Sequence, residues 1–95
     1  MSYKKRADSN QAKITKELRA VGATVQHLHT VGRGVPDLLV GYRGINHLLE
    51  VKVCDKRPSA RKLTRDEEDW HAGWMGTVRV VDSPDAALKA IGAIE

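Results

Sequence analysis

Cysteine, long apolar stretches and internal repeats are what this sequence lacks. Cys54 is the single cysteine, which excludes an internal disulfide and any zinc site built from several cysteines. No apolar run approaches the roughly 20 residues that a membrane-spanning helix needs, so we expect no membrane partner. The basic residues at positions 4–6 are not followed by an apolar stretch, which argues against a secretory signal. We therefore expect a protein that works inside a cell.

Length and composition describe one folded domain spanning residues 1–95. Hydrophobic residues make up 41% of the chain and charged residues 29%, as in folded globular proteins and unlike disordered ones. A chain this short buries only about 60–65% of its unfolded surface, so its core is thin and association with a second copy is favoured. Lys and Arg number 16 against 12 Asp and Glu, and the net charge of +4 suits a polyanionic partner.

Helical periodicity first occurs over residues 8–21, where the apolar side chains share one face and Gly22 provides a stop. Asp8 and Gln11, three residues apart, fit a capping box at the start of this helix. Capping signals also open two further helices, at residues 64–76 (Thr64 with Glu67) and at residues 83–91 (Ser83 before Pro84).

Strands are expected at residues 24–30, 37–42, 46–53 and 77–81, where apolar and β-branched residues lie between turn signals. Arg43-Gly44 suits a hairpin turn, which makes the second and third strands antiparallel neighbours. Residues 54–62 lack periodicity, contain Pro58 and are expected to form a loop. The order α-β-β-β-α-β-α predicts the α/β class, with a mixed sheet flanked by helices.

Two charged residues, Glu50 and Lys52, interrupt the most apolar of these strands. Side chains alternate along a strand, so Glu50 and Lys52 share one face while Leu49 and Val51 point to the other. Charges in a buried strand are destabilising unless they are paired or bind a metal ion. The alternative is an edge strand whose polar face meets water.

Asp37 follows Pro36 at the start of the preceding strand, and the hairpin brings it beside Glu50. Two converging carboxylates are hard oxygen ligands of the kind that suits Mg²⁺, which takes one or two protein carboxylates and keeps several waters. Such an ion would activate an attacking water and offset charge on a phosphate, while Lys52 positions the water or stabilises the added negative charge. The pattern therefore predicts a metal-dependent phosphodiesterase centre.

The segments that carry this chemistry resemble a known family. Gly34-Val35-Pro36-Asp37 followed by Glu50-Val51-Lys52 resembles the PD-(D/E)xK nuclease motif. Residues 8–74 resemble the virus-type replication-repair nuclease (VRR-NUC) family, in its stand-alone phage and prophage form. The matching segments are Asn10-Gln11, Gln26-His27-Leu28-His29-Thr30, Asp37-Leu38-Leu39-Val40-Gly41, Leu49-Glu50-Val51-Lys52, Lys62-Leu63-Thr64 and Trp70-His71.

The resemblance implies a restriction-endonuclease-like α-β-β-β-α-β core and a structure-specific DNA nuclease that uses Mg²⁺ or Mn²⁺. It implies that Asp37 and Glu50 bind the metal, that the backbone carbonyl of Val51 completes the site, and that Lys52 is the catalytic lysine. Stand-alone members are similar to Holliday-junction resolvases that act as dimers. We therefore expect branched DNA and a second copy of the chain as partners, in the cytoplasm of a bacterium or a phage-infected host.

Gln11 has two competing interpretations. Many relatives carry a glutamate near the metal on the first helix, and Gln11 stands at the corresponding place on the inward face. As a neutral ligand it would bind the metal, or a water on it, more weakly than a glutamate. The alternative is the capping box with Asp8.

Basic residues are the candidate DNA contacts, whereas histidines, tryptophans and apolar helix residues have other candidate roles. The DNA-binding set is Arg33, Lys56, Arg57, Arg61 and Lys62. His27 and His29 lack a third soft ligand, so we favour a substrate-facing or hydrogen-bonded role over a zinc site. Trp70 and Trp74 are expected to pack their helix against the sheet rather than stack on bases. Apolar residues of this helix and of the last helix (Ala86, Ala87, Leu88 and Ile91) are candidate dimer contacts.

The leading hypothesis is a Mg²⁺-dependent endonuclease that resolves four-way junctions by attack of activated water on a phosphodiester. One alternative is a nuclease of the same fold that acts on flaps or other branched DNA. Another is a non-catalytic nucleic-acid-binding module in which Glu50 and Lys52 form a structural ion pair.

Overall fold

The structure is a computed structural model that describes the backbone of residues 2–53 and 62–95 and the side chains of residues 10–53 and 62–95. Its helices are α1 (Ser2–Ala20), α2 (Arg65–Gly73) and α3 (Pro84–Ala90), and its strands are β1 (Thr24–His27), β2 (Leu38–Tyr42), β3 (Ile45–Val51) and β4 (Arg79–Val81). The observed order matches the expected α-β-β-β-α-β-α arrangement. No helix in the described part of the chain has the length and apolarity needed to cross a membrane.

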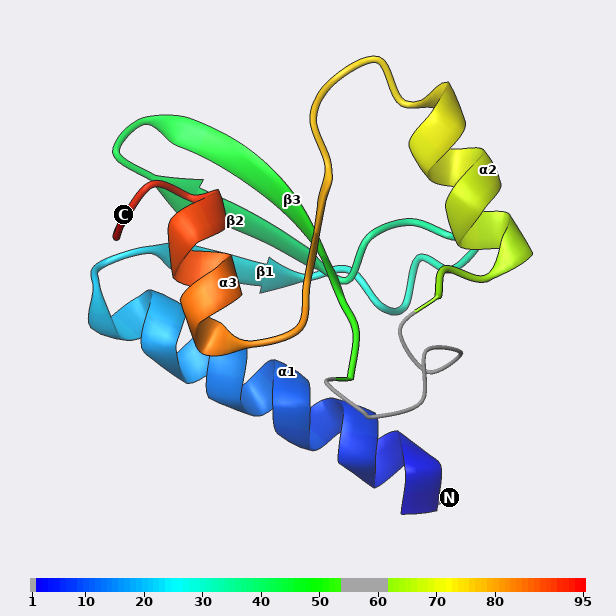
Figure 1. Ribbon diagram of the computed structural model, residues 1–95, viewed down its shortest axis with the longest axis horizontal. Coiled ribbons are helices and arrows are strands. Elements are labelled where there is room, and N and C mark those ends of the chain that lie inside the picture. Colours follow the sequence, from blue (N-terminus) through cyan, green and yellow to red (C-terminus); the bar gives the residue numbers. More distant parts are fainter. Residues whose placement is uncertain (1, 54–61) are drawn as a thin grey trace.

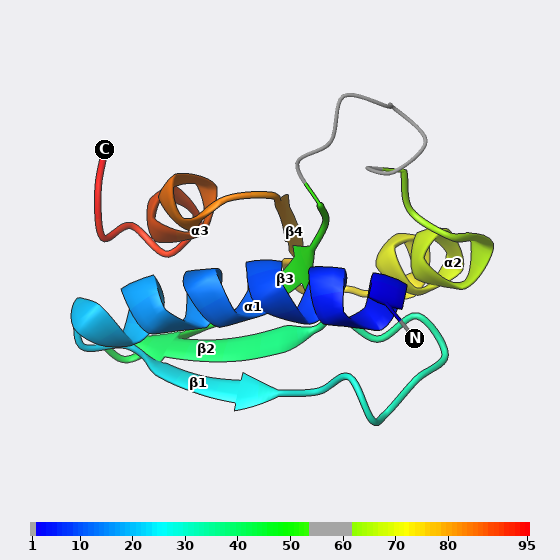
Figure 2. The same cartoon turned by 90° about the horizontal axis from the view of Figure 1, so that it is seen from below.

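The four strands form one mixed sheet in the order β1-β2-β3-β4; β1 to β3 are labelled in Figure 1 and β4 in Figure 2. The pairs β1–β2 and β2–β3 are antiparallel, whereas β3 and β4 are parallel. Arg43 and Gly44 have φ angles of 51° and 81°, the two positive values that a tight two-residue hairpin turn requires. The predicted hairpin is confirmed, and β3 is an interior strand with a neighbour on each side.

Helices α1 and α3 lie side by side on one face of the sheet (Figure 2). The core between them and the sheet is apolar, and its largest fully buried side chains are Ile14, Leu18, Leu38, Val40 and Leu49. Ala87, Leu88 and Ile91 also belong to this core. The interpretation of α3 as a dimer contact is therefore wrong for these three residues, because the thin core of a small domain needs them.

Helix α1 begins earlier than the apolar periodicity indicated, at Ser2 instead of Asp8. Asp8 lies inside the helix, so the capping box with Gln11 is wrong. The strand at residues 24–30 is also shorter than expected: it ends at His27 because the chain turns, with the N–H of Val31 donating to the carbonyl of Leu28 at 2.9 Å.

The N-caps predicted for the last two helices, α2 and α3, are both confirmed. Thr64 Oγ1 accepts from the N–H of Glu67 at 3.2 Å, and a Glu67 carboxylate oxygen accepts from the N–H of Thr64 at 2.8 Å. Ser83 Oγ accepts from the N–H of Ala86 at 3.1 Å at the start of α3. The expected loop at residues 54–62 falls, except for Lys62, outside the described residues.

Helix α2 stands at the end of the sheet where β2 begins and β3 ends (Figure 1). Its first turn packs against the backbone of Gly34, in the segment before β2. A Cβ at Gly34 would clash with the carbonyl group of Asp66 and lie 2.8 Å from the N of Glu67. Gly34 also has a φ of 81°, which L side chains rarely adopt. Close approach to α2 and backbone conformation therefore both require glycine at this position.

Gly34→Ala is expected to lower the thermal midpoint more than Gly32→Ala. Gly32 has a similar φ of 77° but nothing within 4 Å of an added Cβ, so Gly32→Ala measures only the cost of a positive φ for alanine. This cost is about 1 kcal/mol or more in both variants, and the clash with α2 adds to it only at Gly34. Thermal unfolding followed by circular dichroism measures the difference. Equal midpoints for the two variants would contradict the packing of Gly34 on α2.

Candidate active site

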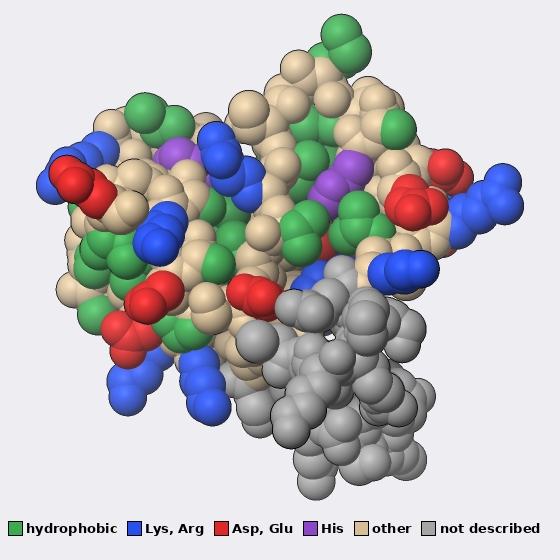
Figure 3. Space-filling view, viewed as in Figure 1, with side chains coloured by type: hydrophobic (Ala, Val, Ile, Leu, Met, Phe, Trp, Pro, Cys, Tyr) green, Lys and Arg blue, Asp and Glu red, His purple; other side chains and the backbone are tan. Residues whose placement is uncertain are grey.

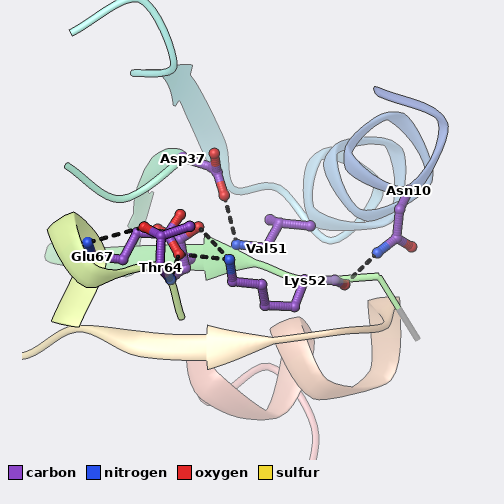
Figure 4. Close-up of polar contacts among 7 residues, drawn as sticks. Asn10, Asp37, Val51, Lys52, Thr64 and Glu67 are labelled. Carbon is purple, nitrogen blue, oxygen red and sulfur yellow. Dashed lines mark hydrogen bonds and ion pairs between the residues drawn. The ribbon is translucent and has the colours of Figure 1, made fainter. Parts of the chain in front are cut away.

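Asp37 and Glu50 meet at the open end of the β2–β3 hairpin. Leu38 pairs with Leu49, so Asp37 and Glu50 are the next residues in register. The carboxylate of Asp37 accepts a hydrogen bond from the N–H of Val51 at 2.8 Å (Figure 4). This side-chain hydrogen bond extends the hydrogen bonding between β2 and β3 by one residue and fixes the Asp37 carboxylate at the end of β3.

Glu50 is a buried carboxyl group in an interior strand. The residue is only 2% exposed, and its Oε1 atom has no hydrogen-bond partner among the described residues. Burial, followed by the neighbouring carboxylates of Asp37 and Glu67, raises the pKa of Glu50 to about 10. The alternative of a polar strand face open to water is therefore wrong for Glu50.

Lys52 lies next to Glu50 but is bonded to a different carboxylate. Its Nζ donates to Glu67 Oε1 at 2.6 Å (Figure 4) and is 3.9 Å from Glu50 Oε2. The Lys52 side chain is 12% exposed, so its ammonium is largely removed from water. At the backbone, the carbonyl of Lys52 accepts from Asn10 Nδ2 of α1 at 2.7 Å.

Glu67 is the residue of this cluster that sequence reasoning missed. It was assigned only to the capping box of α2, a role that it does fill. The same oxygen that accepts from the N–H of Thr64 also accepts from Lys52. Burial acts to raise the pKa of Glu67, but hydrogen bonds from Lys52 and Thr64 outweigh it and hold the pKa below its usual value. Its capping position was the sequence signal for its location at the start of α2.

The charge balance of the cluster favours an added cation. The carboxylates of Asp37, Glu50 and Glu67 carry three negative charges when ionised, and Lys52 offsets one of them. Like charges in a buried site prevent full ionisation unless a counterion is bound. The orphaned Glu50 Oε1 and the hard oxygen donors of the set fit a divalent ion such as Mg²⁺.

Among the described residues, there is no group of three or more His, Cys, Asp or Glu side chains that could hold a metal ion. The binding of a metal by Asp37 and Glu50 therefore stays a prediction, as does the role of His27 and His29. Their rings lie edge to face, with centroids 6.0 Å apart.

Gln11 lines an open groove of about 620 Å³ between α1 and β1, together with Lys16, Arg19, His27 and His29. No hydrogen bond joins Gln11 to Asp37 or Glu50 among the described contacts. The capping box with Asp8 is absent as well. Contact between Gln11 and a bound metal stays a prediction, and so does the role of the Val51 carbonyl as a metal ligand.

The candidate DNA contacts are only partly within the described chain. Arg33 and Lys62 are exposed, whereas Lys56, Arg57 and Arg61 lie outside the described residues. On the face drawn in Figure 3, basic and acidic side chains alternate over the described surface and do not form a single basic field. Their assignment to DNA binding stays a prediction.

Trp70 and Trp74 of the α2 region stack on each other, with ring centroids 4.6 Å apart and planes 18° from parallel. Trp74 also lines a cavity of about 390 Å³ with Leu39 and Leu48, which lie on the sheet face opposite α1. Trp74 remains 45% exposed and no residue of α2 is buried, so packing of this helix against the sheet through the two tryptophans stays a prediction.

No family model and no curated protein matches the chain. Among solved structures, a chain described as a VRR_NUC domain is similar to this one with a TM-score of 0.67 and 27% sequence identity. The similarity covers 95% of this chain and 98% of that chain. The resemblance to the VRR-NUC family that the motifs predicted is therefore confirmed, and the chain is a domain with the VRR-NUC, restriction-endonuclease-like fold.

Proposed function

We propose that this chain is a metal-dependent DNA endonuclease whose catalytic centre consists of Asp37, Glu50 and Lys52. The observation that carries the proposal is the Glu50 carboxyl group, which is buried in an interior strand beside two carboxylates and has one oxygen without a partner among the described residues. An arrangement that destabilises the metal-free protein in this way is typical of a functional site. The similarity to a VRR_NUC domain supports the nuclease class.

Asp37 and Glu50, with the Val51 carbonyl, are the groups that would hold Mg²⁺ or Mn²⁺. When bound, the ion would supply a Lewis acid that activates water and offsets charge on the scissile phosphate. Asp37 is already oriented by the N–H of Val51, so little reorganisation is needed for binding. Lys52 supplies a fixed positive charge beside the carboxylates. There it would orient the attacking water or stabilise the negative charge that develops on the oxygens of the scissile phosphate.

Branched DNA is the proposed substrate, with a four-way junction as the preferred form. Each chain carries one candidate centre, and resolving a junction takes two cuts on opposed strands. A two-fold dimer would present both centres to one DNA molecule. Flaps and other branched DNA are the alternative substrates.

A non-catalytic binding module is less well supported. It requires Glu50 and Lys52 to form a structural ion pair. Lys52 Nζ is within ion-pair distance of Glu50 Oε2 at 3.9 Å, but its hydrogen bond at 2.6 Å is to Glu67, and Glu50 Oε1 has no partner among the described residues. Cleavage assays with and without Mg²⁺ separate the two functions, because a module would bind DNA under both conditions and cut it under neither.

Glu50→Gln is expected to stabilise the metal-free protein and to abolish stabilisation by Mg²⁺. The folded protein holds the Glu50 proton up to about pH 10, whereas the unfolded chain releases it near 4.5. Between these values the unfolded state binds fewer protons, so stability falls as the pH rises. A neutral glutamine removes that loss, and each kcal/mol recovered raises the thermal midpoint by roughly 4–8 °C.

Thermal midpoints in chelator and in Mg²⁺ at pH 8 measure both effects. Glu68→Gln is the matched control, since Glu68 is an exposed glutamate of α2 outside the cluster. Glu50→Gln should also lose cleavage while binding DNA within a few-fold of the unmodified chain, because phosphate contacts come from basic residues. Equal stabilisation by Mg²⁺ in the variant and the unmodified chain would remove Glu50 from the site.

Lys52→Met is expected to lower the cleavage rate by roughly 10²–10³-fold, because a fixed charge aimed at the transition state is lost. Metal binding should persist, since the carboxylates remain. Calorimetric titration with Mn²⁺ checks binding, and single-turnover cleavage checks the rate. Lys89→Met, an exposed lysine of α3, is the control. Loss of metal binding in Lys52→Met would show that the lysine maintains the fold of the site.

The junction proposal predicts a dimer in solution that cuts four-way junctions in preference to linear duplex. Light scattering at micromolar protein concentration tests assembly, and cleavage of both substrates at matched salt tests preference. Matched salt is necessary because backbone contacts make DNA affinity strongly salt-dependent. A monomer that cuts junction and duplex equally would contradict junction resolution without contradicting metal-dependent cleavage.

A further inference from the structure

Lys52 lies between two carboxylates and is bonded to only one of them. Its Nζ donates to Glu67 Oε1 at 2.6 Å, whereas Glu50 Oε2 is 3.9 Å away, beyond hydrogen-bond distance. Glu67 lies 15 residues after Lys52, on α2, and does not belong to the Asp37–Glu50–Lys52 motif. The closest partner of the motif lysine is therefore supplied by a different element of the fold.

We propose that Glu67 is a positioning residue that keeps the Lys52 ammonium away from Glu50, so that Glu50 stays available to a divalent cation. The inference rests on the proposed function, because it assumes that Glu50 binds a metal. It assigns Glu67 a role in the site beyond its role in capping α2.

Removal of the Glu67 charge would redirect Lys52 to Glu50. The Lys52 side chain is 12% exposed, and a buried ammonium without a partner is strongly unfavourable. In the part of the chain that the structure describes, Glu50 is the nearest other carboxylate, with one oxygen 3.9 Å from Nζ and the second without a partner. A shift of Nζ from 3.9 Å to hydrogen-bond distance would give Lys52 a direct contact with Glu50. In that contact the ammonium would occupy the place of the cation beside Glu50 and compete with it.

Glu67 can hold Lys52 in place because Glu67 itself is fixed twice. Its Oε1 accepts from the N–H of Thr64 at 2.8 Å, and its own N–H donates to Thr64 Oγ1 at 3.2 Å. The backbone of Gly34 packs against the same turn of the helix. The segment that leads into Asp37 and the helix that carries Glu67 are thus in direct contact, which sets the distance between Glu67 and the rest of the cluster.

A double-mutant cycle on metal affinity separates positioning from simple charge. The four proteins are the unmodified chain, Glu67→Gln, Lys52→Met and the double variant, each titrated calorimetrically with Mn²⁺ in the absence of DNA. Glutamine keeps an oxygen for the capping box but loses the negative charge. We expect Glu67→Gln to weaken Mn²⁺ binding by about tenfold when Lys52 is present and by less than about threefold in Lys52→Met, a coupling typical of contacting residues.

Equal weakening in both backgrounds would overturn the inference, because it would mean that Glu67 acts on the cation by charge alone. Absence of Mn²⁺ binding by the unmodified chain would overturn the proposed function itself, so the two failures are distinguishable. Glu68→Gln removes an exposed negative charge from the same helix turn and should leave Mn²⁺ affinity unchanged. Circular dichroism confirms that α2 remains folded in each variant.

Glu67→Asp provides a second test that does not change net charge. Aspartate is one methylene shorter, so it can cap the helix but cannot reach both the N–H of Thr64 and Lys52 as Glu67 does. Positioning predicts weakened Mn²⁺ binding in Glu67→Asp and recovery in the Glu67→Asp/Lys52→Met double variant. Unmodified affinity in Glu67→Asp would contradict the inference.

Discussion

Desolvation of the Glu50 carboxyl group is the constraint on which the site depends. An interior strand gives Glu50 a neighbour on each side, and burial, followed by the neighbouring carboxylates of Asp37 and Glu67, raises its pKa to about 10. Nothing in the apolar core requires a carboxyl group there, and a hydrophobic residue of similar size would stabilise the strand. The proposed cation would restore the charge balance and so account for the stability that the fold gives up at this position.

The rest of the architecture fixes the groups around that carboxyl. A tight turn at Arg43 and Gly44 sets the β2–β3 register, and the register places Asp37 opposite Glu50. Helices α1 and α3 cover one face of the sheet and leave the end of the hairpin to α2, which packs on Gly34. Local turn geometry and one close backbone contact thus determine distances within the cluster that no single element could determine alone.

Much of this arrangement could be predicted from the sequence, because its determinants are local. The two-residue period of β3 places Glu50 and Lys52 on one face, and the hairpin signal brings Asp37 to them. Glu67 could not be found in the same way, since its contact with Lys52 depends on how α2 packs after a long connection. The start of α1 at Ser2 was missed because the polar first turns carry no apolar periodicity.

The central claim is that Asp37 and Glu50 together hold a divalent cation. Anomalous diffraction from a crystal of this chain soaked in Mn²⁺ tests it most directly, because the signal locates the ion independently of activity. The account predicts a peak about 2 Å from a carboxylate oxygen of each of these two residues. A peak confined to the groove beside His27 and His29, or a saturated crystal with no ion at Glu50, would contradict it.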